Sequence, residues 1–347
     1  MKKLAIIGHF GLNTTMTDGQ TVKTRTIASA LSERYGSDCL LLSDTHGGAR
    51  TLLRLPFTLL RLLKNAEHIM ILPAQRGVRI IVPLLAALNR FFHRGLHYCV
   101  IGGWLPELLA RKRLLCWMLR AFDGIYPETE TMKKALEALG FTGVSVIPNC
   151  KDLDILPVSA LRDAFSEPYR LCTFSRVMRE KGIEDAVEAV ERINAKFGRT
   201  VYTLDIFGPV DPGQRRWFDD LKLRFPVGVR YCGAVSERES GRALADCFAL
   251  LFPTRFFTEG VPGTIIDAYA AGVPVIASRW ESFSDVIDDG VTGIGYDFAD
   301  REGLYRVLTE LVEQPQRLRA MRISCLKRAK SFRPQDALAP LFIQLET

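Results

Sequence analysis

The amino-acid sequence predicts an α/β protein made of two doubly wound, Rossmann-like sheets. Short apolar runs rich in β-branched residues alternate along the chain with longer segments of helical periodicity, which is the pattern of parallel sheets with helices on both faces. A glycine follows several of the apolar runs, at the strand ends where open α/β sheets bind ligands. The 347 residues exceed what one typical core supports, so two domains of about 150 to 170 residues are expected.

The N-terminal half begins with a strand over Leu4–Gly8 and a helix that starts near Gly19. Thr17 and Asp18 are candidate N-caps, and Gly19 allows a ligand to approach the first helical turn, as in Rossmann-type phosphate sites. Because a GxGxxG motif is absent, an ordinary strand–helix connection explains the same pattern equally well.

A later strand, predicted at Tyr98–Ile101, runs into a turn formed by Gly102, Gly103 and Trp104. Turns at the carboxyl ends of parallel strands lie where ligand crevices form. These three residues are therefore candidates for contacting a substrate.

The domain boundary is expected after a last N-terminal strand at Val144–Ile147, where a proline-containing connection begins. The predicted domains are residues 1–150 and 151–330. Residues 331–347 form a helical tail that is a candidate to pack back on the N-terminal domain.

The net charge of +7 is distributed unevenly along the chain. Residues 1–150 contain 19 Lys and Arg against 10 Asp and Glu, and residues 151–347 contain 27 against 29. Residues 50–120 alone hold 12 basic residues and two acids. This asymmetry indicates an anionic partner for the N-terminal half.

Three leucine-rich segments in this basic region have helical periodicity: Arg50–Lys64, Arg79–Gly95 and Leu105–Gly124. Basic residues that flank many leucines suit helices lying on an anionic membrane, with Arg54, Arg61 and Arg111 as the candidate membrane face. Leucine-rich helices packed on the sheet, with their arginines in solvent, explain each segment equally well. No repeated aromatic platform or recognition motif indicates nucleic-acid binding.

In the C-terminal half, the pattern of Leu250–Ser278 predicts a strand, a loop, a helix that ends at a glycine, and a second strand. Two carboxylates, Glu259 and Asp267, stand eight positions apart across its glycine-rich loop. The helix is expected to begin near Gly263 and Thr264, whose backbone N–H groups would suit a phosphate.

Two cations follow the predicted strand at Tyr169–Ser175, namely Arg176 and Lys181. Cations at the carboxyl end of a strand can neutralise a diphosphate, although two solvated surface residues give the same pattern. Gly208 follows the next predicted strand, Thr203–Phe207, and is a further candidate for close approach of the backbone to a ligand.

Several other kinds of chemistry find little support in the sequence. The eight cysteines show no CxxC pair and no Cys/His ligand spacing, so reduced core thiols are expected rather than a metal or redox site. Asp152 and Asp154 form an Asp-x-Asp pair, but in a connection rather than at a strand end, so no metal site is predicted. No apolar run is long enough to span a bilayer, and the N-terminus favours a first strand over a signal peptide.

The motifs together resemble glycosyltransferase family 4. EGVPGTIIDAYAAGVPVIAS is similar to that family's motif of two acids separated by seven residues and followed by AAGxPV. FSRVMREKGIEDAVEA resembles its Arg…Lys-Gly segment. The N-terminal GxFGxNTTMTDGQTVKTR looks like the subset that builds bacterial capsular, exopolysaccharide or O-antigen units.

The resemblance implies a GT-B architecture, with an N-terminal acceptor-binding domain facing a C-terminal nucleotide-sugar-binding domain across a cleft. It implies transfer of a sugar, with retention at the anomeric carbon, from a nucleotide diphosphate donor to a lipid-linked saccharide. UDP is the commoner nucleotide, and no metal or other cofactor is implied. The protein would be cytoplasmic and peripheral on the inner face of the plasma membrane.

Site roles follow from the same resemblance. Glu259 would contact the transferred sugar and Asp267 the ribose. The donor diphosphate would be bound by Arg176, Lys181, Gly263 and Thr264, with Gly19 and Gly208 close to the donor and Gly102, Gly103 and Trp104 on the acceptor side.

Two departures leave rival functions open. The family usually has Glu where this chain has Asp267, and no histidine stands near Gly102. A catalytically silent subunit that binds nucleotide and supports another transferase therefore stays an alternative. A nicotinamide-dependent dehydrogenase is disfavoured because both GxGxxG and a Tyr-x-x-x-Lys pair are absent.

Overall fold

The computed structural model describes residues 3–11, 19–47, 49–162, 165–236 and 239–346. It divides into two compact units. Unit 1 comprises Met1–Asp152 together with Phe332–Thr347, and unit 2 comprises Leu153–Ser331. Thr17 and Asp18, the candidate N-caps, lie outside the described residues.

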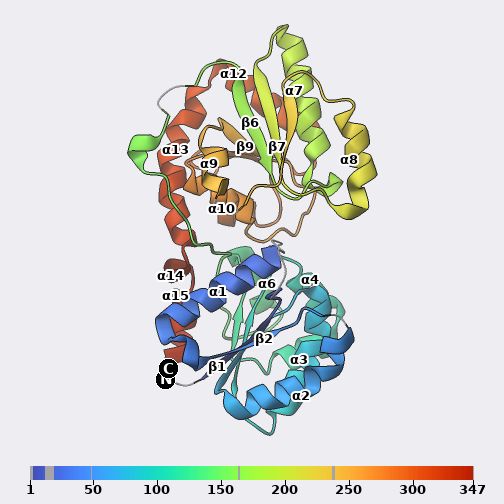
Figure 1. Cartoon of the computed structure of the whole chain (residues 1–347), viewed down its shortest axis with the longest axis vertical. Helices are drawn as coiled ribbons and strands as arrows, with labels where there is room; N and C mark the ends of the chain where they lie inside the picture. Colours follow the sequence, from blue (N-terminus) through green and yellow to red (C-terminus); the bar gives the residue numbers. More distant parts are fainter. Residues whose placement is uncertain (1–2, 12–18, 48, 163–164, 237–238, 347) are drawn as a thin grey trace. The chain divides into compact units, whose positions relative to one another are not determined.

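Unit 1 is built on a five-stranded parallel sheet of order β2-β1-β3-β4-β5 (Figure 1). The sheet consists of β1 (Leu4–Gly8), β2 (Leu40–Asp44), β3 (His68–Leu72), β4 (Gly95–Cys99) and β5 (Gly124–Tyr126). The helices are α1 (Gly19–Tyr35), α2 (Ala49–Asn65), α3 (Gln75–Asn89), α4 (Leu105–Arg111), α5 (Arg113–Leu119), α6 (Glu130–Ala138), α14 (Pro334–Ala337) and α15 (Ala339–Glu346).

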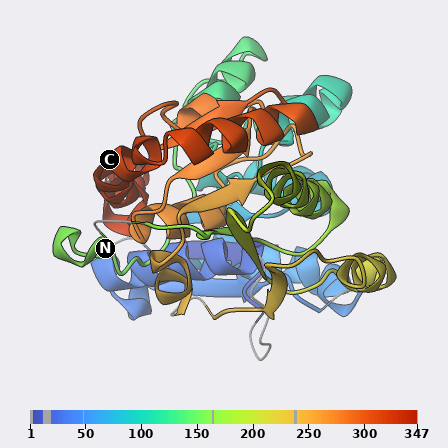
Figure 2. The same ribbon diagram turned by 90° about the horizontal axis from the view of Figure 1, so that it is seen from above.

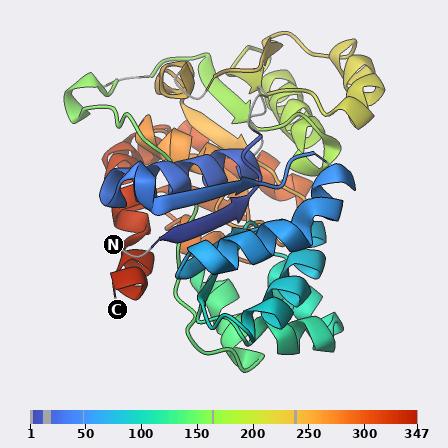
Figure 3. The same ribbon diagram turned by 60° about the horizontal axis from the view of Figure 1, so that its bottom comes forward.

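Successive side chains of β1 alternate between two cores, because a strand directs neighbouring residues to opposite faces. Ala5 and Ile7 belong to the core that α2, α3, α5 and α6 cover. Leu4 and Ile6 belong to the core on the other face, which α1 shares with the C-terminal helices α14 and α15. Figure 3 shows α1 and α2 on opposite sides of β1. The apolar residues of unit 1 thus fold into two helical layers around a buried sheet.

Unit 2 is built on a six-stranded parallel sheet of order β11-β10-β9-β6-β7-β8. The strands are β6 (Tyr169–Phe174), β7 (Tyr202–Phe207), β8 (Val229–Gly233), β9 (Ala249–Phe252), β10 (Val275–Ser278) and β11 (Gly293–Tyr296). The helices are α7 (Ile183–Phe197), α8 (Arg215–Lys222), α9 (Ser240–Ala245), α10 (Gly263–Ala270), α11 (Phe283–Val286), α12 (Arg301–Glu313) and α13 (Gln316–Ala329).

Helices cover unit 2 on both faces of its sheet. On one face α7, α8 and α12 bury a core that includes Leu171, Ile206 and Leu251, and Figure 2 shows α7 and α12 on the same side of the sheet. Helix α10 contacts α9 and α13. Both units are therefore parallel, Rossmann-like α/β sheets, as the sequence predicts.

The strand–helix–strand unit predicted around Leu250–Ser278 is confirmed. β9 ends at Phe252, α10 begins at Gly263, and β10 begins at Val275. Gly272 ends the helix with a φ of +65°, in the left-handed region that a helix C′ glycine favours.

Several features of unit 1 differ from the sequence prediction. The strand predicted at Tyr98–Ile101 is β4, which instead spans Gly95–Cys99. β3 was not predicted, because it follows α2 after only two residues and no glycine or proline marks its start. The helix predicted over Leu105–Gly124 is divided at Lys112, where φ and ψ are −124° and 73°. The last predicted strand, Val144–Ile147, makes only a single bridge, from Val144 to Ile125.

Candidate active site

The order of the strands in unit 2 places a topological switch point between β6 and β9. The chain proceeds from β6 to β7 and β8 on one side, and from β9 to β10 and β11 on the other. The two central strands pair in register through Leu171 with Ala249 and Cys172 with Leu250. Open α/β sheets bind ligands outside the carboxyl ends of the strands at such a point.

The loops that leave β6 and β9 approach each other closely at Gly182. This residue lies at the start of α7 with a φ of +68°. A Cβ atom there would overlap the carbonyl oxygen of Pro253, the first residue after β9. Glycine is therefore required at position 182 both by its left-handed backbone and by the contact.

Lys181 and Glu259 form an ion pair across the switch point. The Lys181 ammonium contacts Glu259 Oε1, and the two side chains are only 17% and 16% exposed. Thr254 Oγ1 donates to the same carboxylate oxygen at 3.2 Å. The ammonium also lies 5.1 Å from the ring centroid of Phe256, within the range of a cation–π contact. The structure thus brings together a cation and an acid that lie 78 residues apart in sequence.

A buried carboxylate braces the loop that carries Glu259. Asp185, on α7, is 8% exposed and accepts from Arg255 at 2.6 Å and 3.0 Å. Arg301, at the start of α12, contacts the same carboxylate at 2.8 Å. The backbone N–H of Arg255 donates to the carbonyl oxygen of Glu180 at 2.8 Å, next to Lys181. The sequence reveals no sign of this clamp, since its members are far apart in the chain.

The start of α10 lies in the same loop, four residues after Glu259. Its N-cap, Pro262, offers no side-chain hydrogen bond, and the first N–H groups of a helix have no intrahelical acceptor. Thr264 Oγ1 is buried and has no hydrogen-bond partner among the residues that the structure describes. Gly263 and Thr264 therefore provide polar groups that suit an anion.

Arg176 and Gly208 lie at the carboxyl ends of β6 and β7. The Arg176 guanidinium is 3.7 Å from Asp211 and half exposed, so it is accessible to a solvent-borne anion. Gly208 has a φ of +128°, and a Cβ atom would overlap the carbonyl oxygen of Ser175. Close packing of the two strand ends explains why position 208 holds glycine.

Asp267 is buried on α10, at 6% exposed. Its Oδ1 accepts from Ser240 Oγ, at the first turn of α9, at 3.5 Å. The role of Asp267 toward a ribose stays a prediction.

The candidate residues of unit 1 lie at the carboxyl edge of its own sheet. Gly19 is the first residue of α1. Gly102 has a φ of +76°, and the Trp104 indole donates to the carbonyl oxygen of Ile101 at 2.7 Å, which fixes the turn that includes Gly103.

Two histidines at this edge were not singled out from the sequence. His9 follows β1, His46 follows β2, and their ring centroids are 5.0 Å apart. Asp44 Oδ1 accepts from the backbone N–H groups of both Phe10, at 3.0 Å, and His46, at 2.9 Å. A histidine directly after a predicted strand is the signal that could have identified His9.

The candidate membrane residues Arg54, Arg61 and Arg111 are exposed. Arg111 pairs with Glu107 at 2.7 Å. Large apolar side chains on α2 and α5 are exposed nearby in sequence: Leu53, Phe57, Leu114 and Trp117. Among the described residues, no helix combines the length and apolarity needed to cross a bilayer.

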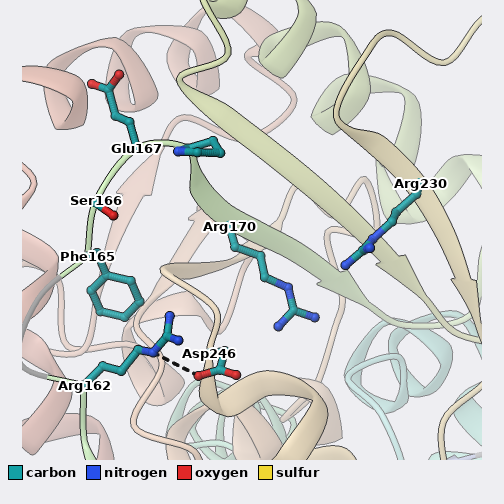
Figure 4. A pocket seen from close by; sticks show the side chains of 8 residues that line it. Arg162, Phe165, Ser166, Glu167, Arg170, Arg230 and Asp246 are labelled. Carbon is teal, nitrogen blue, oxygen red and sulfur yellow. Dashed lines mark ion pairs between the residues drawn. The ribbon is translucent and has the colours of Figure 1, made fainter.

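A pocket of about 460 Å³ lies at the opposite, amino-terminal edge of the unit 2 sheet (Figure 4). Arg170 and Arg230, near the starts of β6 and β8, both contact the buried Asp205. Arg162 pairs with Asp246 at 3.1 Å. Because each arginine already pairs with a carboxylate, this pocket is less suited to bind a diphosphate than the carboxyl edge of the sheet is.

No cluster of three or more His, Cys, Asp or Glu side chains within the described ranges could hold a metal ion.

Two parallel Rossmann-like sheets are the architecture of GT-B glycosyltransferases. Comparison with known proteins agrees with this fold. Residues 168–314, which lie within unit 2, match the family model described as "Glycosyl transferases group 1".

Two relatives illustrate the match. A glycogen synthase of Mycobacterium tuberculosis is 26% identical over 221 residues, which are 62% of this chain and 52% of the relative. The amylovoran biosynthesis glycosyltransferase AmsK of Erwinia amylovora is 26% identical over 210 residues, 59% of this chain and 49% of the relative. The matched region thus spans about half the length of these relatives.

The fold is also that of a solved structure. Alr3699/HepE of Anabaena, crystallised with UDP and glucose, superposes with a TM-score of 0.75 over 100% of both chains at 15% sequence identity.

Proposed function

We propose that the protein is a retaining glycosyltransferase that transfers a sugar from a nucleotide diphosphate donor, with a UDP-sugar as the expected donor, to a lipid-linked saccharide. The observation that supports this proposal is the Lys181–Glu259 ion pair at the β6/β9 switch point. Cell-surface polysaccharide synthesis is the pathway class that we infer, and one relative, AmsK, is named for amylovoran biosynthesis.

The geometry suggests how the leaving diphosphate would be stabilised. Departure of the sugar concentrates negative charge on the diphosphate. Arg176 would bind it through a guanidinium fork and Lys181 as a point charge, while the N–H groups of Gly263 and Thr264 add the positive end of α10. Preorganised groups of this kind lower the barrier because they need no reorganisation during the reaction. These residues would supply the charge for which other transferases use a metal.

The transferred sugar would lie against Glu259. Thr254 and Lys181 hold this carboxylate in place, so its oxygens can accept from sugar hydroxyls and stabilise positive charge that develops at the anomeric carbon. Asp267 would accept from the ribose hydroxyls.

A panel of nucleotides tests the donor assignment. Thermal unfolding is measured with UDP, GDP, ADP and their sugars, because a ligand that binds the folded state raises the melting temperature by mass action. A selective shift with one diphosphate is expected, and it should shrink in Lys181→Met. If none of the nucleotides shifts the melting temperature, the proposal is wrong.

Retention and metal independence are tested on the product. NMR coupling constants of the new glycosidic bond should match the anomeric configuration of the donor, and activity should persist in EDTA. A product with the inverted anomeric configuration would overturn the proposed retention but not the proposed sugar transfer.

The acceptor is proposed to reach the enzyme at an anionic membrane surface, placing the protein at the inner face of the plasma membrane. Arg54 and Arg61 are exposed on α2, the helix that also exposes Phe57 at 75%. Arginine attracts anionic lipid by about 1 kcal/mol per residue, and an aromatic ring inserts at the interface.

Sedimentation with phosphatidylglycerol vesicles tests this surface. Arg54→Gln with Arg61→Gln should reduce binding, whereas Arg215→Gln with Arg216→Gln, exposed cations of unit 2, should not. Equal binding by both pairs would contradict the membrane assignment.

A catalytically silent nucleotide-binding subunit is the second candidate, favoured by the burial of Asp267 and its contact with Ser240. Slow hydrolysis of the donor without any acceptor would eliminate it.

A further inference from the structure

Two exposed aromatic rings stand beside the proposed catalytic acid. Phe256 is 39% exposed and Phe257 is 52% exposed, and both precede Glu259 in the loop after β9. Single exposed apolar residues are ordinary. Adjacent exposed rings at the edge of a candidate active site instead indicate a contact surface.

The backbone under these rings is held on both sides. Arg255 is clamped to the buried carboxylate of Asp185. The N–H of Phe256 donates to Thr254 Oγ1 at 3.2 Å, and the carbonyl oxygen of Phe257 accepts from the N–H of Glu281 at 3.0 Å. The two rings are therefore presented by a braced loop.

The rings also have neighbours that orient them. The Lys181 ammonium lies 5.1 Å from the centroid of Phe256. The ring of Phe257 packs edge-to-face on Phe298, with centroids 5.2 Å apart and an interplanar angle of 75°. Phe256, Phe257 and Phe298 are called the aromatic rim here.

We propose that the aromatic rim binds a pyranose ring of the acceptor saccharide, which stacks its C–H face on Phe257; this rests on the proposed function. A pyranose has an apolar face of polarised C–H groups, and the face of a phenyl ring is negative, so the two attract each other. The transferred sugar must stay near Lys181 and Glu259, which are less exposed than Phe257. The next sugar outward is then that of the acceptor.

Kinetics of Phe257 variants test the stacking. Phe257→Ala should raise the acceptor KM about threefold to tenfold, as expected for an aromatic contact of about 0.5 to 1.5 kcal/mol. The donor KM and donor hydrolysis without acceptor should not change. Phe257→Trp should keep the acceptor KM near the wild-type value. Phe257→Leu should raise it as Phe257→Ala does, because leucine is apolar but has no π face.

Leu223→Ala provides the matched control, because this side chain is 87% exposed in the same unit and far in sequence from the loop. It should leave every constant unchanged. A rise in the donor KM instead of the acceptor KM would assign Phe257 to the transferred sugar and overturn the proposal, as would full activity of Phe257→Leu.

A binding measurement does not depend on turnover. Saturation-transfer NMR with methyl β-D-glucopyranoside, in the presence of UDP, should show transfer from aromatic protein protons to the pyranose C–H groups, lost in Phe257→Ala. No transfer to the wild-type protein or an undiminished signal in the variant would overturn the proposal. Failure of the proposed function is recognised separately, by the absence of donor hydrolysis in the wild-type enzyme.

Discussion

The ammonium group of Lys181 has two competing partners in the proposed reaction, the carboxylate of Glu259 and the diphosphate of the donor. Both side chains of the ion pair are largely buried, so their attraction is screened less than that of a surface pair. Binding of a diphosphate must therefore share or replace the contact with Glu259.

This competition predicts opposite effects for the two residues. Glu259→Gln should reduce transfer by about 100-fold or more, since it removes a charge from the reacting centre, yet bind UDP at least as tightly because Lys181 is released. Lys181→Met should weaken UDP binding about tenfold or more, as expected for a lost charged hydrogen bond. Calorimetric titration measures the UDP affinity of the two variants, and a transfer assay measures the activity of Glu259→Gln. Equal losses of UDP affinity would contradict the competition.

His97 links the stability of unit 1 to pH. Its Nε2 lies 3.0 Å from His68 Nδ1, and its Nδ1 lies 3.0 Å from the Tyr126 hydroxyl. Burial and the neighbouring charge of His68 lower the pKa of His97 from 6.5 to about 4, although Asp123 opposes the shift. The neutral imidazole is thus the form that the folded protein favours.

A lowered pKa means that the unfolded chain binds the proton more tightly than the folded chain. The contribution of His97 is fully present above about pH 6.5 and is lost as pH falls toward 4. We expect the free energy of unfolding to fall by about 2 kcal/mol from this residue between pH 7 and pH 5. Urea unfolding at the two pH values measures the fall, which should be smaller in His97→Gln. An equal fall in wild type and variant would rule this contribution out.

At the scale of elements, the β6 and β9 loops meet at Gly182. Alanine substitution there can be compared with substitution at another glycine to separate the cost of lost packing from the cost of a left-handed backbone. Gly198, at the other end of α7, has a similar φ of +63° but has nothing within reach of a Cβ atom. Gly198→Ala should therefore cost only the left-handed strain, about 1 to 2 kcal/mol.

Gly182→Ala should cost more, about 3 kcal/mol, because the new methyl group must displace Pro253 as well. It should also raise the donor KM, since Lys181 directly precedes the substituted residue. Urea unfolding and donor kinetics of the two variants check the comparison. If both variants behave alike, the loop contact contributes little.

Asp185 allows a similar test of the clamp under the Glu259 loop. Asp185→Asn leaves Arg255 without a charged partner and Arg301 with only Glu188, and it should lower the free energy of unfolding by about 1 to 3 kcal/mol. The arginines are 35% and 48% exposed, and solvent moderates the loss. Glu188→Gln removes the exposed pair with Arg301 and should change stability by less than about 0.5 kcal/mol. Thermal unfolding compares the two, and a larger effect of Glu188→Gln would refute the clamp.

Elements whose ends are marked by their own residues could be predicted from the sequence. Contacts between segments that are far apart in the chain could not. The β9–α10–β10 unit was predictable because Gly263 and Gly272 mark the ends of its helix. The break at Lys112 was not, because Arg111, Lys112 and Arg113 carry no turn signal. Among site residues, the resemblance identified Lys181 and Glu259, but their pairing depends on the strand order.

At the scale of the whole molecule, unit 1 is completed by residues from the far end of the chain. Leu338 and Leu341 are fully buried, and Phe342 is 7% exposed, in the core shared with α1. Arg34 adds a 2.7 Å bond to Glu346, and both are about half exposed.

Removing residues 332–347 should therefore destabilise unit 1 and leave unit 2 folded. Burial of each large apolar side chain stabilises by about 1.5 to 3 kcal/mol, so the loss should reach several kcal/mol. Hydrogen exchange should show faster exchange confined to unit 1, whereas Glu346→Gln, which removes only an exposed ion pair, should leave the exchange rates of both units nearly unchanged. Protection lost equally from both units would contradict this division.

The return of the chain to unit 1 also sets an order for folding during synthesis. Unit 2 is a continuous segment, Leu153–Ser331, whereas unit 1 needs Phe332–Thr347. Because domains fold as units while the ribosome elongates the chain, the sheet of unit 1 emerges before unit 2 but keeps the α1 side of its core uncovered until α15 has left the exit tunnel. Unit 1 would therefore begin to emerge before unit 2 and finish folding after it.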